Sequence, residues 1–204
     1  MKLTKILGVV AAAAMALMAF ASTASATTLE IGGVKQTSAV TIVSSLKAGT
    51  SAILKDTSGS FANTCTESTV EGKTSTFTGT TVSGPISSLT FKSCKEEPVV
   101  VDTTGSLSVE WIPTTAKETE EGKTSTKGTV RSIGAKVTSP SPFGALTCTT
   151  AASPGTDIGT LTGVSSGAAT MDINAVLNCG FFLPSAKWEG TYTVTSPAGL
   201  GVTS

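Results

Sequence analysis

Four cysteines are the residues whose chemistry and spacing are most informative in this chain: Cys65, Cys94, Cys148 and Cys179. The first two are 29 positions apart and the last two are 31 positions apart. Metal sites and redox-active pairs usually show close motifs such as C-x-x-C, which this chain lacks. Four cysteines allow three pairings, and the nearly equal gaps favour Cys65–Cys94 and Cys148–Cys179. Each disulfide would close a loop of about 30 residues and stabilise the fold by roughly 3–4 kcal/mol.

Catalytic residues are harder to find. The chain has no histidine, which excludes Ser-His-Asp and Cys-His nucleophiles and histidine-ligated zinc. A carboxylate pair of the glycosidase kind remains open, but no spacing singles out two of the acids near predicted strands, which are Glu67, Glu110, Asp172 and Glu189. The Gly-Lys-Thr steps at 72–74 and 122–124 lack the earlier glycine of a phosphate-binding loop. We therefore expect no enzyme activity, no cofactor and no metal.

Three aromatic residues form the candidate ligand-binding set. Trp111, Trp188 and Tyr192 are the only Trp and Tyr residues, and the last two lie four positions apart on a predicted strand. Their side chains therefore share one face of that strand. Exposed rings could stack on sugars, as in a carbohydrate-binding module, whereas buried rings would fill the core. Because aromatic residues make up only 5% of the chain, core positions are the favoured interpretation.

The first 26 residues have the order of a secretory signal peptide. Lys2 and Lys5 give a positive start, Ile6–Phe20 is an unbroken apolar run, and Ala24-Ser25-Ala26 offers small residues for cleavage after Ala26. The apolar run is shorter than the roughly 20 residues that a membrane span needs. We expect residues 27–204 to form a single secreted β domain, extracellular or, in a cell with an outer membrane, periplasmic. No integral membrane segment is expected after cleavage.

The elements that position these residues are predicted to be β-strands. Threonine and serine supply 37 and 26 of the 204 residues, and threonine packs well on a pleated surface. Apolar residues alternate with polar ones in 171–179, where one face carries Met171, Ile173, Ala175, Leu177 and Cys179. Glycine and proline interrupt the chain at intervals of about ten residues, which is typical of antiparallel sheets. The sequence therefore predicts an all-β, antiparallel, sandwich-like domain.

Two segments, about 61–111 and 143–196, read as related units. In each unit a phenylalanine precedes the first cysteine, a proline follows the second, and a glycine then opens an alternating strand. The predicted disulfides would lie one within each unit. A hexapeptide, Glu-Gly-Lys-Thr-Ser-Thr, also occurs at 71–76 and 121–126, out of phase with these units.

Two local features are expected between the predicted strands. Leu89 and Phe91 share a face from which Cys94 departs by one position, and this phase change predicts a β-bulge. The polar stretch 114–127, which is rich in Lys and Glu, is predicted to be a solvated loop between the two units.

Two short segments are similar to parts of known sequences. Cys65-Thr-Glu-Ser68 and Pro184-Ser-Ala-Lys-Trp188-Glu-Gly-Thr-Tyr192 resemble segments of a family of uncharacterised secreted bacterial β-proteins. The resemblance implies export and disulfides. It implies no activity and no catalytic residues.

Taken together, these patterns predict a secreted structural or surface-interaction protein of the bacterial cell envelope or exterior, without catalysis. Its partner would be a protein or a cell-surface polysaccharide. The alternative is a carbohydrate-binding module that uses Trp188, Tyr192 and Trp111. A net charge of zero and a single arginine argue against a nucleic-acid partner.

Overall fold

The computed structural model describes residues 26–102, 108–113, 118–120, 123–142, 144–180 and 184–203, with side chains left out for 108–125. The described residues form antiparallel strands and turns, and none of them forms a helix long and apolar enough to cross a membrane. Residues 1–25 of the predicted signal peptide and Phe143 of the second unit lie outside the described residues.

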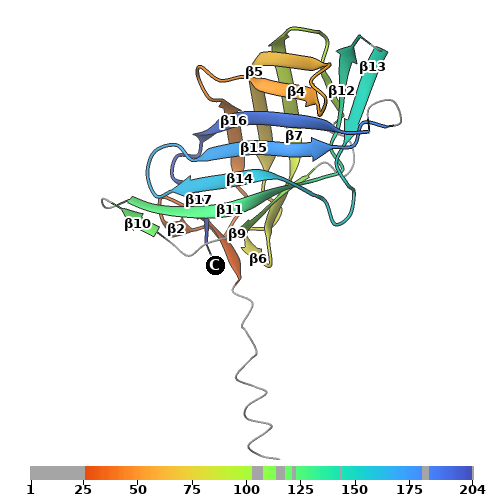
Figure 1. The fold of residues 1–204 in the computed structure, drawn as a ribbon. Coiled ribbons are helices and arrows are strands. Elements are labelled where there is room, and N and C mark those ends of the chain that lie inside the picture. Colours follow the sequence, from red (N-terminus) through yellow and green to blue (C-terminus); the bar gives the residue numbers. More distant parts are fainter. Residues whose placement is uncertain are drawn as a thin grey trace, which may run out of the picture.

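The largest sheet has ten strands and closes on itself (Figure 1). Its order is β10 (Glu118–Glu120), β11 (Lys123–Ile133), β14 (Thr156–Val164), β15 (Thr170–Leu177), β16 (Ala186–Ser196), β3 (Thr41–Leu46), β5 (Ala62–Lys73), β7 (Val82–Cys94) and β9 (Ser108–Pro113). Strand β4 (Ala52–Asp56) lies between β16 and β5. Because β9 also pairs with β11, the ladder returns to its start, and we call this the closed sheet.

Two smaller sheets accompany the closed sheet. One has the order β17 (Leu200–Thr203), β1 (Thr27–Ile31) and β2 (Val34–Lys35), with β6 (Thr78–Gly79) also paired to β1. The other, here called the three-stranded sheet, has the order β13 (Gly144–Thr149), β12 (Lys136–Ser141) and β8 (Val100–Asp102). In Figure 1, β12 and β13 stand at the upper right, whereas β17 and β6 lie towards the bottom. The two smaller sheets therefore occupy different ends of the molecule.

Alternating burial explains why these sequences form strands. In β15, Met171, Ile173, Ala175 and Leu177 are buried while the residues between them are exposed. Each inward residue gains hydrophobic stabilisation, and each outward residue keeps its contact with water. The buried side chains form one hydrophobic cluster that also includes Leu29 and Val202 of the sheet of β1 and β17. The three sheets thus share a single core.

The backbones of β14 and β17 approach each other closely at two glycines, Gly163 and Gly201. A Cβ atom on Gly163 of β14 would lie 2.6 Å from the Cα atom of Gly201 on β17. A side chain at Gly163 would therefore push β17 away from the closed sheet.

The predicted fold class is confirmed: the chain is all-β and antiparallel, and it contains both predicted disulfides. Strands on opposite sides of the closed sheet face each other across the core, as the layers of a sandwich do. The pairing of β9 with β11 was not predicted, because a sequence pattern shows which face of a strand is buried but not which strand pairs with its edge.

The predicted bulge near Cys94 is wrong in its position. The register between β5 and β7 shifts instead where Gly72 pairs with Ile86 after Glu71 has paired with Ser88. Near Cys94 the register is continuous, and the change of face coincides with Ser93, whose φ is 52°. Both strands change face together at this point, so neither contains an extra residue.

The loop predicted over 114–127 is also wrong in part. Strand β10 and the beginning of β11 lie within this stretch, and Thr119 pairs directly with Thr124. Threonine is β-branched and suits a strand even among charged neighbours, which explains the difference. Residues 114–117 and 121–122 lie outside the described residues.

Candidate functional site

The first disulfide joins neighbouring strands within the closed sheet. Cys65 on β5 and Cys94 on β7 are directly opposite in the register, with 3.8 Å between their Cα atoms. The same two strands are held together by a long antiparallel ladder that runs from Cys65 to Gly72. Cys65 is buried and Cys94 is half-buried. This disulfide therefore reinforces a pairing that the backbone already makes.

The second disulfide joins two different sheets. Cys148 lies on β13 of the three-stranded sheet, and Cys179 follows the end of β15 in the closed sheet. One isolated backbone bridge accompanies it, in which Thr149 and Asn178 exchange hydrogen bonds of 2.7 and 3.2 Å. Both cysteines are buried. This disulfide therefore fastens the three-stranded sheet to the closed sheet. All four cysteines are paired, as predicted.

Two of the three aromatic residues considered for sugar stacking lie inside the molecule. Trp188 and Tyr192 on β16 are 8% and 1% exposed. The Trp188 ring packs edge to face against Phe91, with 6.1 Å between the ring centroids. A stacking platform needs ring faces in water, and the rings of these two residues are buried instead. The backbone of Trp111 lies on β9, where it pairs with Val82 and Val130, and its side chain lies outside the described part.

The polar atoms of the two buried aromatic residues differ in their hydrogen bonding. The Tyr192 hydroxyl forms a 3.0 Å hydrogen bond with the hydroxyl of buried Ser68. Burial raises the pKa of the Tyr192 phenol to about 12, while the Ser68 hydroxyl and the nearby Trp188 indole lower it to a smaller extent. The Trp188 Nε1–H itself is buried without a hydrogen-bond partner among the described residues. Tyr192 is therefore held neutral over the physiological pH range.

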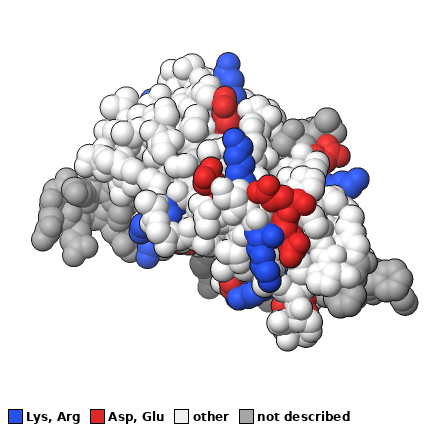
Figure 2. Space-filling model, turned by 90° about the horizontal axis from the view of Figure 1, so that it is seen from above, with Lys and Arg blue, Asp and Glu red and all other residues white. Residues whose placement is uncertain are grey.

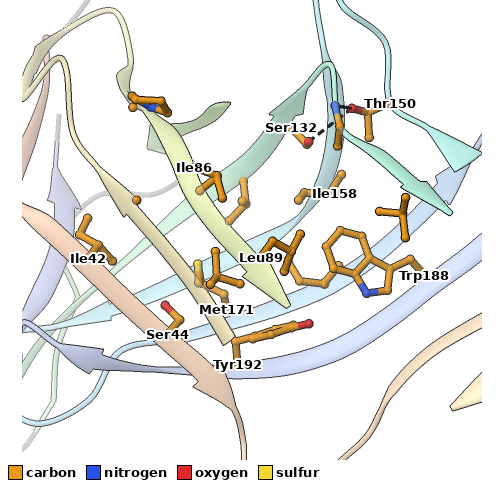
Figure 3. A pocket seen from close by; sticks show the side chains of 18 of the residues that line it. Ile42, Ser44, Ile86, Leu89, Ser132, Thr150, Ile158, Met171, Trp188 and Tyr192 are labelled. Atoms are coloured by element: carbon orange, nitrogen blue, oxygen red, sulfur yellow. Dashed lines mark hydrogen bonds between the residues drawn. The ribbon is translucent and has the colours of Figure 1, made fainter. Parts of the chain in front are cut away.

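Trp188 and Tyr192 border an internal cavity, seen from close by in Figure 3. Ile42 of β3, Leu89 of β7 and Met171 of β15 point into the same space from different strands. The cavity has a volume of about 80 Å³, counted as the space that the centre of a water molecule can occupy. Its wall comes mainly from the inner surface of the closed sheet, and it also includes Val137 and Cys148 of the three-stranded sheet.

The polar side chains in the cavity wall are largely paired with each other or with the backbone. Ser132 and Thr150 share a hydrogen bond of 3.3 Å, drawn in Figure 3. The Thr150 hydroxyl also accepts the Ala135 N–H at 2.8 Å, and the Thr74 hydroxyl accepts the Val40 N–H at 2.9 Å. Hydrocarbon therefore makes up most of the surface that faces the cavity.

The sequence did not predict this cavity. Its wall combines residues from many strands, and small residues such as Ser44 and Ala135 occur at inward positions where larger ones would fill the space. Those small residues are the signal in the sequence. They point to a cavity only once the pairing of the strands is known.

Among the four acids considered for catalysis, Asp172 and Glu189 lie diagonally on the outer face of the paired strands β15 and β16, Glu67 lies on β5, and the side chain of Glu110 lies outside the described part. Asp172 accepts a hydrogen bond from Thr191, and Glu67 accepts one from Ser93. Glu189 forms ion pairs with Lys187 and Lys55 at 2.7 and 2.6 Å, and these two lysines lower the pKa of its carboxyl group. Figure 2 shows acidic and basic side chains interspersed on the face seen from above. Within the ranges that the structure describes, no three Cys, Asp or Glu side chains gather as metal ligands.

Comparisons with known proteins add no relative from which a function could be carried over. The resemblance noted in the sequence therefore stays a prediction. This chain matches no family model, no curated protein and no solved structure.

Proposed function

We propose that this chain is an exported, non-catalytic interaction protein that acts at the bacterial cell envelope or exterior. The order of charged, apolar and small residues in the first 26 positions supports export. The two disulfides are consistent with an extracellular or periplasmic protein, because disulfides persist in oxidising compartments.

The observation that carries the interaction role is the open edge of β13. Among the described strands, β13 pairs only with β12, apart from the single bridge between Thr149 and Asn178. The Thr149 N–H donates to Asn178, away from β12. Backbone groups of an antiparallel strand alternate in direction, so the N–H groups of Thr147 and Ala145 also point away from β12. An edge of this kind can pair with an extended strand of another protein.

The chemistry of the interior supports a role without catalysis. Among the residues that line the cavity, Tyr192 is held neutral by burial, and the Ser132 and Thr150 hydroxyls are hydrogen-bonded to each other. Nucleophilic catalysis by a hydroxyl requires an adjacent general base. We therefore assign binding, rather than bond-making, to this chain, and the partner we favour is an extended polypeptide segment.

The test is adsorption of the purified, oxidised protein to intact cells of the bacterium that produces it. Thr147→Pro removes the outward N–H of the β13 edge and leaves the backbone hydrogen bonds to β12 in place, although it also removes the hydroxyl that bonds to Thr138 at 3.0 Å, as the control variant does. Thr147→Val is the matched control, because it keeps the backbone N–H and changes only the side chain. We expect saturable adsorption that Thr147→Pro weakens about tenfold and Thr147→Val preserves, with both variants melting near the wild-type temperature.

Three outcomes would contradict the proposal. Absence of saturable adsorption would reject the interaction role. Adsorption that Thr147→Pro leaves unchanged would reject the β13 edge as the binding surface. Adsorption that disappears when surface polysaccharide is oxidised, but survives protease treatment of the cells, would favour a polysaccharide partner over a protein.

A further inference from the structure

The cavity in the closed sheet has the size of a small ligand. It offers about 80 Å³ to the centre of a water-sized molecule. Since one water needs roughly 10–15 Å³ of such space, the cavity has room for about five to eight water-sized groups. That is the size of one six-membered ring. An ordinary packing defect is smaller, because protein cores leave few voids larger than a single water.

The wall of the cavity is unsuited to water. A buried water needs two to four hydrogen-bond partners, as a rule. The hydroxyl groups of Ser132 and Thr150 are bonded to each other, and that of Tyr192 is bonded to Ser68. The Trp188 Nε1–H is shielded from water-sized molecules in the cavity as well as from bulk solvent. Several waters placed in this space would therefore lose hydrogen bonds that the wall does not replace.

The same wall is well suited to an apolar molecule. Ile158, Met171 and Ile173 present side-chain carbon to the space from β14 and β15, and Leu89 does so from the facing strand β7. Atoms that line an empty space lack dispersion contacts on one side, and an apolar occupant supplies them. Met171 adds an adaptable thioether side chain, which can adjust to the shape of an occupant.

We propose that the cavity is a binding site for a small apolar molecule of about the size of one six-membered hydrocarbon ring. This site is separate from the β13 edge and goes beyond the surface-interaction function. Its occupant is recognised by shape and by the absence of polar groups. A polar group on the ligand weakens binding, since the wall is mostly carbon and offers that group few partners beyond the Ser44 hydroxyl.

Toluene and phenol are matched probes for this site, because they have similar shapes and differ in one polar group. Methyl NMR of the oxidised protein, with Met171, Ile158 and Ile173 as reporters, follows each titration. We expect saturable shifts of these methyl signals with toluene and none at the exposed Val34 and Val100. Phenol should bind at least about fivefold more weakly, because a wall that is mostly carbon replaces few of the hydrogen bonds that its hydroxyl group makes with water.

Two alanines provide matched variants. Ala135 lines the cavity and is 6% exposed, whereas Ala145 lies exposed on β13. Ala135→Leu adds three carbons inside the space, and Ala145→Leu adds the same atoms outside it. We expect Ala135→Leu to weaken toluene binding about tenfold or more, because the added carbons occupy the volume that the ligand needs. Ala145→Leu should bind toluene as the wild type does.

Ser44→Val is the second filling variant and decides the result if Ala135→Leu does not fold. Ser44 lines the cavity from β3, whereas Ala135 lies between β11 and β12. Absence of toluene-dependent shifts at Met171 and Ile173 would overturn the proposal. So would phenol binding as tight as toluene binding, or filling variants that keep the wild-type affinity. Thr147→Pro should leave toluene binding intact, so failure of the surface role and failure of this site are distinguishable.

Discussion

The two disulfides have nearly the same span in the chain and different surroundings in the fold. Cys65–Cys94 lies within the ladder of β5 and β7, which backbone hydrogen bonds hold over many residues. Cys148–Cys179 connects the three-stranded sheet to the closed sheet, beside one isolated backbone bridge. In the chain-entropy account, loops of 29 and 31 residues contribute almost equally. Any difference between the effects of the two disulfides on stability must therefore come from the other contacts that hold the joined strands together.

This comparison separates two roles of a disulfide. Within a paired ladder the bond restricts the unfolded chain and changes the folded state little. Between two sheets the bond also determines whether one part stays attached to the other. Because Val137 and Cys148 of the three-stranded sheet line the cavity, that attachment also places part of the cavity wall. The predicted duplication of two units stays a prediction, and the different surroundings show that its halves would have diverged in structure.

The largest expected effect follows removal of the disulfide between the sheets. Cys148→Ala with Cys179→Ala should lower the free energy of unfolding by roughly 4–5 kcal/mol, from lost chain restriction and from a cavity at two buried side chains. Amides of Val137 and Leu146 should lose their protection from hydrogen exchange before the amides of β15 do. Denaturant titration and native-state exchange measure both effects. Equal protection in the two sheets would contradict the attachment role.

Removal of the disulfide within the ladder should have a smaller and more uniform effect. Cys65→Ala with Cys94→Ala should lower the free energy of unfolding by roughly 3 kcal/mol, since the loop term is lost while β5 and β7 stay paired. Amides of β5 and β7 should exchange together with those of the rest of the closed sheet. A loss larger than that of the Cys148 and Cys179 variant would reverse the comparison.

Asn63 provides a second connection between the closed sheet and the three-stranded sheet. Its Nδ2 donates to Ser139 on β12 at 2.9 Å and to the Glu96 carbonyl at 2.8 Å, while its Oδ1 accepts the Glu96 N–H at 3.0 Å. Asn63→Ala should cost about 2 kcal/mol, because buried polar partners lose their hydrogen bonds. Asn174→Ala, on the exposed face of β15, is the control and should change stability by less than about 0.5 kcal/mol.

Combining Asn63→Ala with the Cys148 and Cys179 substitutions sharpens the comparison. If both connections hold the three-stranded sheet, their effects on stability should not be additive. Combining Asn63→Ala with the Cys65 and Cys94 substitutions tests the other disulfide in the same way. Additive effects for the first combination would show that Asn63 and the second disulfide act independently.

The smallest expected effect at neutral pH concerns the interior of the closed sheet. Tyr192→Phe removes the hydrogen bond to buried Ser68 and should cost about 1 kcal/mol. As pH rises, the stability difference between the wild type and Tyr192→Phe should change, because the Tyr192 pKa is raised to about 12 in the folded protein. The folded state binds this proton more tightly than the unfolded state, whose pKa is about 10. The stability from burying the neutral phenol is therefore present below pH 10 and declines as pH rises towards 12.

Tyr192 is the only tyrosine, so the ultraviolet absorbance of tyrosinate reports its titration directly. The folded protein should show a midpoint near 12, and the unfolded protein a midpoint near the ordinary value. Denaturant titrations of wild type and Tyr192→Phe at alkaline pH separate its contribution from that of the lysines. A midpoint near the ordinary value in the folded protein would contradict the buried position and with it the lining of the cavity.

Several features of this protein followed from the sequence because their physical basis is local. Alternation of apolar and polar residues over 171–179 identified the buried face of β15, since a strand turns successive side chains to opposite faces. The scarcity of aromatic residues placed Trp188 and Tyr192 in the core, where large apolar surfaces gain most from burial. The spacing of four cysteines favoured the pairing that the structure contains. Composition and position along the chain were enough for these inferences.

Other features were decided only by the tertiary structure. The pairing of β9 with β11 closes the largest sheet, yet the contacts that form it depend on how every intervening strand is placed. The cavity exists because small inward residues on separate strands meet at one point, which no single strand reveals. The contrast between the two disulfides is likewise absent from their spacing. Strand pairing between distant segments determines all three, because hydrogen bonds along a sheet edge carry almost no signature in the side chains that form them.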